Sequence, residues 1–300
     1  MGRRCFSFGA GPWDPDRRFE TSCLLRPWTL FFCRAAMCIY AFVTIFFIII
    51  FSCTAESSPP TPSSPSPETP IAMTEKDVTT GCASVPRSFS YFTVLSYWGL
   101  AFYFLFASVH TFSYARTRQP LLLRFPRPLQ ALHALFYSSV VVFPFIVTLT
   151  YWAVLSRSFH FPTAFDTWRN LSQHALNSVF ALFEIIVPRT NPLPWLHLLW
   201  LALILLTYLA VAFITLADQG FFVYGFLDYR QAGGRAYVAA YVLGITAALV
   251  LIFCAVHFLI RLRCWLTESK LQLAAKYARE PLVVADVEVA DVKTKASREK

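Results

Sequence analysis

Charged residues are scarce in this chain. They make up 14% of its 300 residues, whereas a soluble domain carries about a quarter. Hydrophobic residues reach 56% and aromatic residues 17%. This composition excludes an ordinary water-soluble domain and predicts an integral membrane protein.

Two further absences narrow the class of membrane protein to which the chain belongs. The chain has no internal repeat, which argues against a transporter built from duplicated halves. Its net charge of +9 comes with no nucleic-acid-binding motif, and the basic residues are spread over loops and tails. Attraction to anionic cytoplasmic lipid explains them better, so we expect membrane lipids and no nucleic acid as partners.

The eight cysteines do not form a disulfide framework. Only Cys82 lies clearly in a predicted outer loop, and Cys53 lies at the edge of an apolar run, so we predict no structural disulfide. The cysteines on or near the predicted cytoplasmic surface are either unmodified thiols or sites of reversible palmitoylation; they are Cys5, Cys23, Cys33, Cys38 and Cys264.

What the chain does have is six apolar runs. About 20 residues at 1.5 Å per residue cross the hydrocarbon core of a bilayer, and we therefore predict an all-α bundle of six transmembrane helices. The predicted spans are Ala35–Cys53, Phe89–Phe112, Leu129–Leu155, Leu171–Val187, Trp195–Leu216 and Tyr237–Leu259. The fourth is the shortest and the most polar.

The distribution of basic residues supports six spans with both termini in the cytoplasm. Only six of the 26 Lys and Arg residues then fall outside, whereas removing the fourth span abolishes the asymmetry. The six outer residues are Lys76, Arg87, Arg157, Arg169, Arg230 and Arg235.

The chain therefore divides into five parts. A basic cytoplasmic tail (1–34) precedes the first span (35–53), which we interpret as an anchor because its lead is longer than the start of a signal peptide. A Pro/Ser/Thr-rich outer linker (54–87) is predicted to be disordered. A five-helix membrane core (88–260) and a cytoplasmic C-terminal tail (261–300) complete the chain.

Two outer features leave alternatives open. The motif NLS at Asn170 matches a glycosylation acceptor next to the membrane, with its occupancy left open. The aromatic segment DQGFFVYGFLDYRQAGGR (218–235) either lies in the membrane interface or covers an outward-facing pocket.

The most informative polar residues are Thr93 and His174. Each lies about a turn below the outer end of its predicted span, and both spans run from outside to inside. Polar groups inside a bilayer tend to face the bundle interior and mark functional sites. If the two helices pack together, Thr93 becomes a candidate nucleophile and His174 its base, an arrangement suited to acyl transfer.

The same helices carry residues that support a catalytic site, but Thr93 and His174 also have purely structural explanations. A membrane threonine often bonds its own backbone, and a membrane histidine often joins two helices, so a purely structural seam is a competing interpretation. The residues that would extend the site or the seam are Asn177, Ser178, Glu184, Ser96 and Tyr97. Asn177 is a candidate oxyanion donor or orienter of His174, and Glu184 is expected to be protonated or hydrogen-bonded.

Four histidines near the cytoplasmic ends of the spans suggest a third, weaker alternative, a metal or haem protein. None of them shares the close helical spacing of a convincing metal site, so we expect no metal and no cofactor. They are His110, His133, His197 and His257.

At this point the motifs resemble a known family. The sequence WRNLSQHALNSVFALFE, with His174 and Glu184, is similar to the androgen-induced family of six-span membrane proteins. So are SYFTVLSYWGLAFYF, with Thr93 at the family's threonine position, and GFFVYGFLD. The resemblance covers roughly residues 91–228. It implies a threonine hydrolase that cleaves fatty acid esters of hydroxy fatty acids, with Thr93 as nucleophile and His174 as base.

The chain also departs from the family pattern. Phe222, Gly225 and Asp228 stand where the family usually has Trp, Pro and an acid, and the combination resembles a fungal branch. We therefore expect a lipid-ester hydrolase of the endoplasmic reticulum or plasma membrane acting on a lipid with a long acyl chain. A non-enzymatic membrane scaffold or regulator is the alternative.

Overall fold

The structure, a computed structural model, describes residues 14, 16–54, 81–82, 84–156 and 161–273. The described residues are helical and contain no strand, only one isolated bridge between Ser22 and Pro188. Five helices are long and apolar enough to cross a membrane. They are α1 (Pro27–Thr54), α3 (Phe92–Thr117), α4 with η3 (Arg127–Leu155), α7 (Trp195–Gln219) and α8 with η6 (Arg235–Lys270). The all-α prediction is confirmed for this part of the chain, and the five helices fit a multipass membrane protein.

The predicted fourth span corresponds to three helical segments that follow one another without a break. They are α5 (Ala164–Leu171), η4 (Ser172–Leu176) and α6 (Asn177–Ile186). The helix begins before Leu171 because Thr163 caps it, its hydroxyl accepting the Asp166 amide at 3.0 Å. At 1.5 Å per residue the whole stretch is about 33 Å long. Its polar first part keeps it out of the set of long apolar helices.

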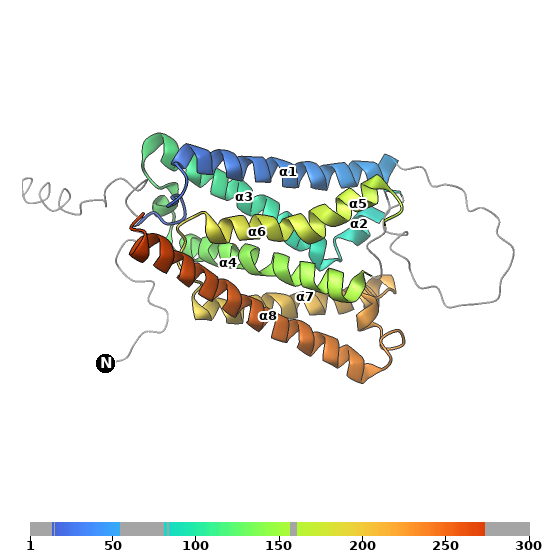
Figure 1. Cartoon of the computed structure of the whole chain (residues 1–300). Coiled ribbons are helices and arrows are strands. Elements are labelled where there is room, and N and C mark those ends of the chain that lie inside the picture. Colours follow the sequence, from blue (N-terminus) through green and yellow to red (C-terminus); the bar gives the residue numbers. More distant parts are fainter. Residues whose placement is uncertain (1–13, 15, 55–80, 83, 157–160, 274–300) are drawn as a thin grey trace, which may run out of the picture.

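The long helices lie side by side in an elongated bundle, with α1 at one edge and α8 at the opposite edge (Figure 1). α1 packs mainly on α3, while α4 lies at the centre against α3, α6 and α8. Buried aromatic and aliphatic side chains such as Tyr103, Phe104 and Phe253 fill the space between them. The short helices α2 (Ser84–Ser88) and α5 both lie towards the same end of the bundle (Figure 1).

The outward faces of the helices carry large apolar side chains. Leu243 and Leu251 in α8 and Ile39 in α1 are 68%, 70% and 64% exposed. Thr207 and Thr246, which are also exposed, donate their hydroxyls to carbonyls one turn earlier in their own helices, at 2.8 Å each. A surface whose hydroxyls are satisfied internally and whose bulk is apolar suits lipid rather than water.

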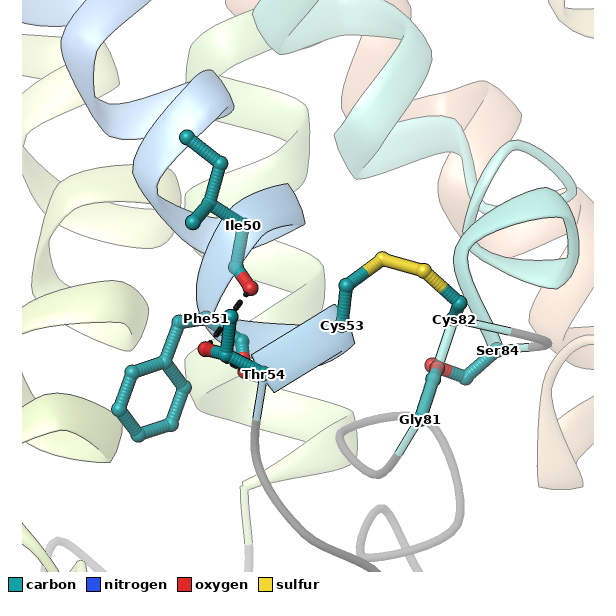
Figure 2. The surroundings of a disulfide bond; sticks show 7 residues. All are labelled: Ile50, Phe51, Cys53, Thr54, Gly81, Cys82 and Ser84. Carbon is teal, nitrogen blue, oxygen red and sulfur yellow. Dashed lines mark hydrogen bonds between the residues drawn. A yellow bond between two sulfur atoms is a disulfide. The ribbon is translucent and has the colours of Figure 1, made fainter.

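A disulfide joins Cys53, at the end of α1, to Cys82, just before α2 (Figure 2). The prediction of no structural disulfide was therefore wrong. Because α1 packs on α3, the two ends of the linker between them meet, and a cysteine at the edge of a span can reach one in the loop. Nearby, Thr54 and Ser84 satisfy their hydroxyls locally, on Ile50 and Gly81. We call this end of the bundle the disulfide end.

The chain before α1 packs across the opposite end. The Ser22 hydroxyl donates to the Val187 carbonyl, and the Arg189 amide donates to the Thr21 carbonyl at 2.9 Å. Arg18 forms a two-pronged ion pair with Glu268 in η6, at 2.9 Å for each contact. We call this the ion-pair end. The first helix begins at Pro27, eight positions before the predicted start, with proline in the first turn where its missing amide does no harm.

Candidate functional site

Thr93 lies in the first turn of α3, at the disulfide end, and is partly exposed. The helix has no side-chain cap of its own at Tyr91. The free amide of Phe92 instead donates to two phenols, Tyr208 at 3.0 Å and Tyr224 at 3.1 Å. The two phenols therefore lie beside the backbone amide that precedes the candidate nucleophile.

His174 lies in η4, a π-helical turn between α5 and α6. Its side chain is 7% exposed, and its ring stacks on Tyr151 with centroids 3.6 Å apart and planes 6° apart. Trp152 fixes the backbone at this point by donating its indole NH to the His174 carbonyl at 2.9 Å. The Nδ1 atom of His174 is buried without a hydrogen-bond partner among the described residues. Single π turns of this kind occur often at functional sites.

The helices that carry Thr93 and His174 are neighbours. α3 contacts η4. Val94, which follows Thr93, and Gln173, which precedes His174, line one small cavity of about 70 Å³. The two elements therefore meet at similar depth. Among the hydrogen bonds of the described residues, none joins the Thr93 hydroxyl to the His174 ring, so their joint catalytic role stays a prediction.

Asn177 and Ser178 lie between helices rather than beside His174. The Thr148 hydroxyl on α4 pairs with the Ser178 hydroxyl at 2.7 Å and with Asn177 Oδ1 at 3.2 Å. The Asn177 amide group is directed at the Pro144 carbonyl, 3.5 Å away. These contacts form a polar seam between α4 and α6, as the structural alternative anticipated.

Ser96 and Tyr97 do not extend the site either. The Ser96 hydroxyl donates to the carbonyl of Thr93 at 3.0 Å, within its own helix. Tyr97 is buried, with its hydroxyl close to that of Thr44 in α1. Neither hydroxyl of this second pair has a hydrogen bond of normal length. Ser96 therefore contacts only the backbone carbonyl of the candidate nucleophile, and Tyr97 faces α1.

Glu184 belongs to a charged network that the sequence did not predict. Both its oxygens accept from Arg34 in α1, at 2.7 and 2.8 Å, and Tyr103 donates to it at 2.9 Å. Arg34 also donates to the Thr111 hydroxyl and the Phe19 carbonyl. Both charged side chains are almost completely buried. Arg34 was assigned to the N-terminal tail, yet a glutamate inside an apolar run is stabilised either by a proton or by a cation, and the arginine at the edge of another run was the available signal for a cation.

The four histidines considered for metal or haem do not gather in one place. His110 and His133 lie with ring centroids 5.2 Å apart. His197 bonds Ser138 at 2.7 Å, and His257 lies 2.9 Å from the Leu193 carbonyl. Within the described part of the chain, no group of three or more His, Cys, Asp or Glu side chains is placed to hold a metal ion.

The structure also bears on the modification sites. Asn170 is 3% exposed and bonds both Tyr151 and the Asp166 carbonyl, so its amide is closed to a glycosyl donor in this fold. Cys23 and Cys38 are buried, whereas Cys33 and Cys264 are partly exposed. Cys5 and residues 55–80 and 83 of the predicted linker lie outside the described residues. The end of the linker is not disordered as predicted, because it begins the helix α2.

Comparison with known proteins adds no relative. No family model, no curated protein and no solved structure matches the chain. The function has to be argued from the arrangement of its own residues.

Proposed function

We propose that the chain crosses the membrane six times, with both termini in the cytoplasm and the disulfide end on the outer or lumenal side. The stretch Ala164–Ile186 would be the fourth crossing, and its length supports this. The Cys53–Cys82 bridge supports the orientation, because disulfides persist in oxidising compartments and not in the cytosol. The scarcity of Lys and Arg in the outer segments agrees with it. The endoplasmic reticulum and the plasma membrane both suit this arrangement.

We further propose that the disulfide end carries a hydrolase site for long-chain lipid esters, with Thr93 as nucleophile and His174 as base. The observation that carries this is the imidazole itself, a buried ring held flat against Tyr151 whose Nδ1 has no hydrogen-bond partner in the part of the chain that the structure describes. A buried nitrogen without a partner is disfavoured unless a second group or a substrate uses it. Because α3 contacts η4, the helix that carries the Thr93 hydroxyl lies next to the turn that carries His174.

The reaction would proceed in two steps. Thr93 Oγ1 attacks the ester carbonyl carbon while its proton passes to His174, and the proton then leaves with the alcohol, which gives an acyl-threonine. Water next attacks the acyl carbon with His174 again taking the proton, and the fatty acid departs as Thr93 regains its hydrogen. The resemblance to the androgen-induced family favours fatty acid esters of hydroxy fatty acids as substrates.

The test is labelling of the full-length protein in native membranes by a lipase-type fluorophosphonate probe. We expect the native protein and Thr93→Ser to be labelled, because both keep a hydroxyl, and Thr93→Ala to be unlabelled. His174→Ala should lower the labelling rate by about 10²-fold or more, the effect of losing a general base. Undiminished labelling of Thr93→Ala would exclude Thr93 as the nucleophile.

A non-enzymatic scaffold is the second candidate, and the seam of Thr148, Asn177 and Ser178 favours it. Under that interpretation His174 serves only to pack α4 against the fourth helical stretch. The same variants separate the two. If the protein is a scaffold, the native protein hydrolyses no ester and the variants lose thermal stability in detergent. If it is a hydrolase, Thr93→Ala loses hydrolysis but unfolds at nearly the native temperature.

A further inference from the structure

Two consecutive residues at the end of the third long helix hold His174. They are Tyr151 and Trp152, the first residues of η3 (Tyr151–Leu155), a π-helical turn that continues α4. The Tyr151 ring lies flat against the imidazole, with centroids 3.6 Å apart and planes 6° apart. The Trp152 indole NH donates to the His174 carbonyl at 2.9 Å. The same turn therefore contacts both the ring and the backbone of the proposed base.

Tyr151 is itself held by Asn170, which lies one helical turn before His174. The Tyr151 phenol donates to Asn170 Oδ1 at 2.8 Å, and Asn170 Nδ2 donates to the Asp166 carbonyl at 2.9 Å. The second bond fixes which end of the amide faces Tyr151, because only the amide oxygen accepts a hydrogen bond. Tyr151 and Asn170 are both buried. The phenol therefore joins the helical stretch that carries His174 at two points, Asn170 and the imidazole.

A parallel ring at van der Waals distance restricts how the imidazole turns. Rotation about the Cβ–Cγ bond of His174 would drive an edge of its ring into the face of Tyr151, only 3.6 Å away. The lone pair of a neutral imidazole nitrogen lies in the plane of the ring, so a fixed plane fixes the direction from which a proton is taken. A catalytic base is usually oriented by a third group. Nδ1 has no hydrogen-bond partner among the described residues, and the stacked phenol supplies the orientation instead.

We infer that Tyr151 is a positioning residue for His174, holding the imidazole in one plane for proton transfer while Asn170 anchors the phenol. The inference rests on the proposed hydrolase function. Orientation matters because a displacement of about 1 Å at a reacting atom is able to lower a rate about 10²-fold. A scaffold would use the same stack only to pack α4 against the fourth helical stretch, so the test has to separate positioning from packing.

The experiment measures kcat and KM of the full-length protein with a p-nitrophenyl ester of a long-chain fatty acid in detergent micelles. Tyr151→Leu removes the stacked ring and should lower kcat by about tenfold or more, because the imidazole is no longer held in one plane. KM should stay close to the native value, since Tyr151 acts through His174 and not on the substrate. Tyr151→Phe keeps the ring and loses only the bond to Asn170, so it should retain most of the native kcat.

The matched control is Tyr137→Leu. Tyr137 is a buried phenol on the same helix, and its hydroxyl bonds Thr190 at 2.6 Å. Its loss should lower the unfolding temperature without a comparable fall in kcat per folded molecule. Equal falls in Tyr137→Leu and Tyr151→Leu would overturn the inference, because any weakening of the packing of α4 would then be sufficient. Tyr151→Met, whose flexible side chain fills irregular gaps, repeats the measurement if Tyr151→Leu does not stay folded in detergent.

The decisive comparison uses a protein that already lacks the base. If Tyr151 acts through His174, adding Tyr151→Leu to His174→Ala should cause no further loss of kcat, since no imidazole is left to hold. A further loss as large as that in the native protein would show a packing role and overturn the inference.

His174→Ala alone reports on the proposed function. A native kcat in that variant removes the assignment of His174 as base, and the role of Tyr151 falls with it. A low kcat in His174→Ala together with a native kcat in Tyr151→Leu leaves the proposed base in place and overturns only the positioning role.

Discussion

The two ends of the bundle bury polar groups in different ways. At the ion-pair end, Arg34 and Glu184 satisfy each other and draw in Tyr103 and Thr111. At the disulfide end, His174 keeps a buried ring nitrogen without a hydrogen-bond partner among the described residues. An ion pair whose hydrogen bonds are satisfied holds helices together, whereas the imidazole nitrogen without a partner is the proposed base. The contrast teaches that the most strongly charged site in this membrane bundle is not the best candidate for function.

The largest effect should come from breaking the charged pair. Arg34→Ala leaves Glu184 buried without its cation, which costs about 3–5 kcal/mol, and we expect a marked drop in the unfolding temperature in detergent. The double variant Arg34→Met with Glu184→Leu removes both charges and should recover much of the loss, because two apolar side chains bury no charge. A small effect of Arg34→Ala would mean that the ion-pair end does not hold the bundle together.

Removing the disulfide should have an intermediate effect. The variant Cys53→Ser with Cys82→Ser opens a loop whose ends are 29 residues apart, and a bridge of this kind contributes about 2–4 kcal/mol. We expect a lower unfolding temperature and slower labelling at Thr93, because α2 and the start of α3 lose their tether to α1. Native protein treated with reductant is the matched control. A variant as stable as the native protein would show that the bridge does not tether this end.

The most gradual effect should come from Glu20, next to the charged network, because it is spread over several pH units. Its carboxyl is fully buried without a hydrogen-bond partner among the described residues, and burial, with Asp14 nearby, raises its pKa from 4.5 to about 8 against the opposing pull of Arg34 and Arg17. The unfolded carboxyl ionises near 4.5. Stability should therefore fall as pH rises from about 4.5 to about 8, by at most about 1.4 kcal/mol per pH unit.

Glu20→Gln supplies the comparison for this prediction. The amide does not ionise, so the decline in stability with pH should be shallower and the variant more stable than the native protein near pH 8. Unfolding temperatures measured from pH 5 to pH 8.5 give the result. Parallel curves for the two proteins would mean that the buried carboxyl does not keep its proton in the folded state.

Much of the architecture was predictable because the membrane imposes it. A helix that crosses lipid has to be long and apolar, and five of the predicted runs correspond to helices of that kind. The fourth was predicted shorter than it is, since the polar residues of α5 conceal its start. The meeting of α3 with the helix that carries His174 was a condition of the proposed site and not a result of the sequence, and the contact between α3 and η4 meets that condition.

The partners of individual side chains were not predictable in the same way. Arg34 looked like part of a basic tail, and only the packing of α1 shows that it reaches Glu184. From the sequence, Cys53 is only a residue at the edge of a span. Its disulfide partner is evident only in the fold, where the end of α1 lies beside the loop before α2. Tyr208 and Tyr224 looked like two of many aromatic residues at the membrane interface, and their convergence on Phe92 depends on how α7 and the segment after it return to α3.

The sequence by itself determined that this is a helical membrane protein and where its helices lie, because the cost of exposing backbone and charge to lipid acts on each segment separately. The tertiary structure alone decided which polar groups meet, since that depends on how each helix is rotated about its axis and on which neighbour it packs against. A rotation of one residue, about 100°, exchanges an inward side chain for an outward one, and no property of a single segment fixes that choice.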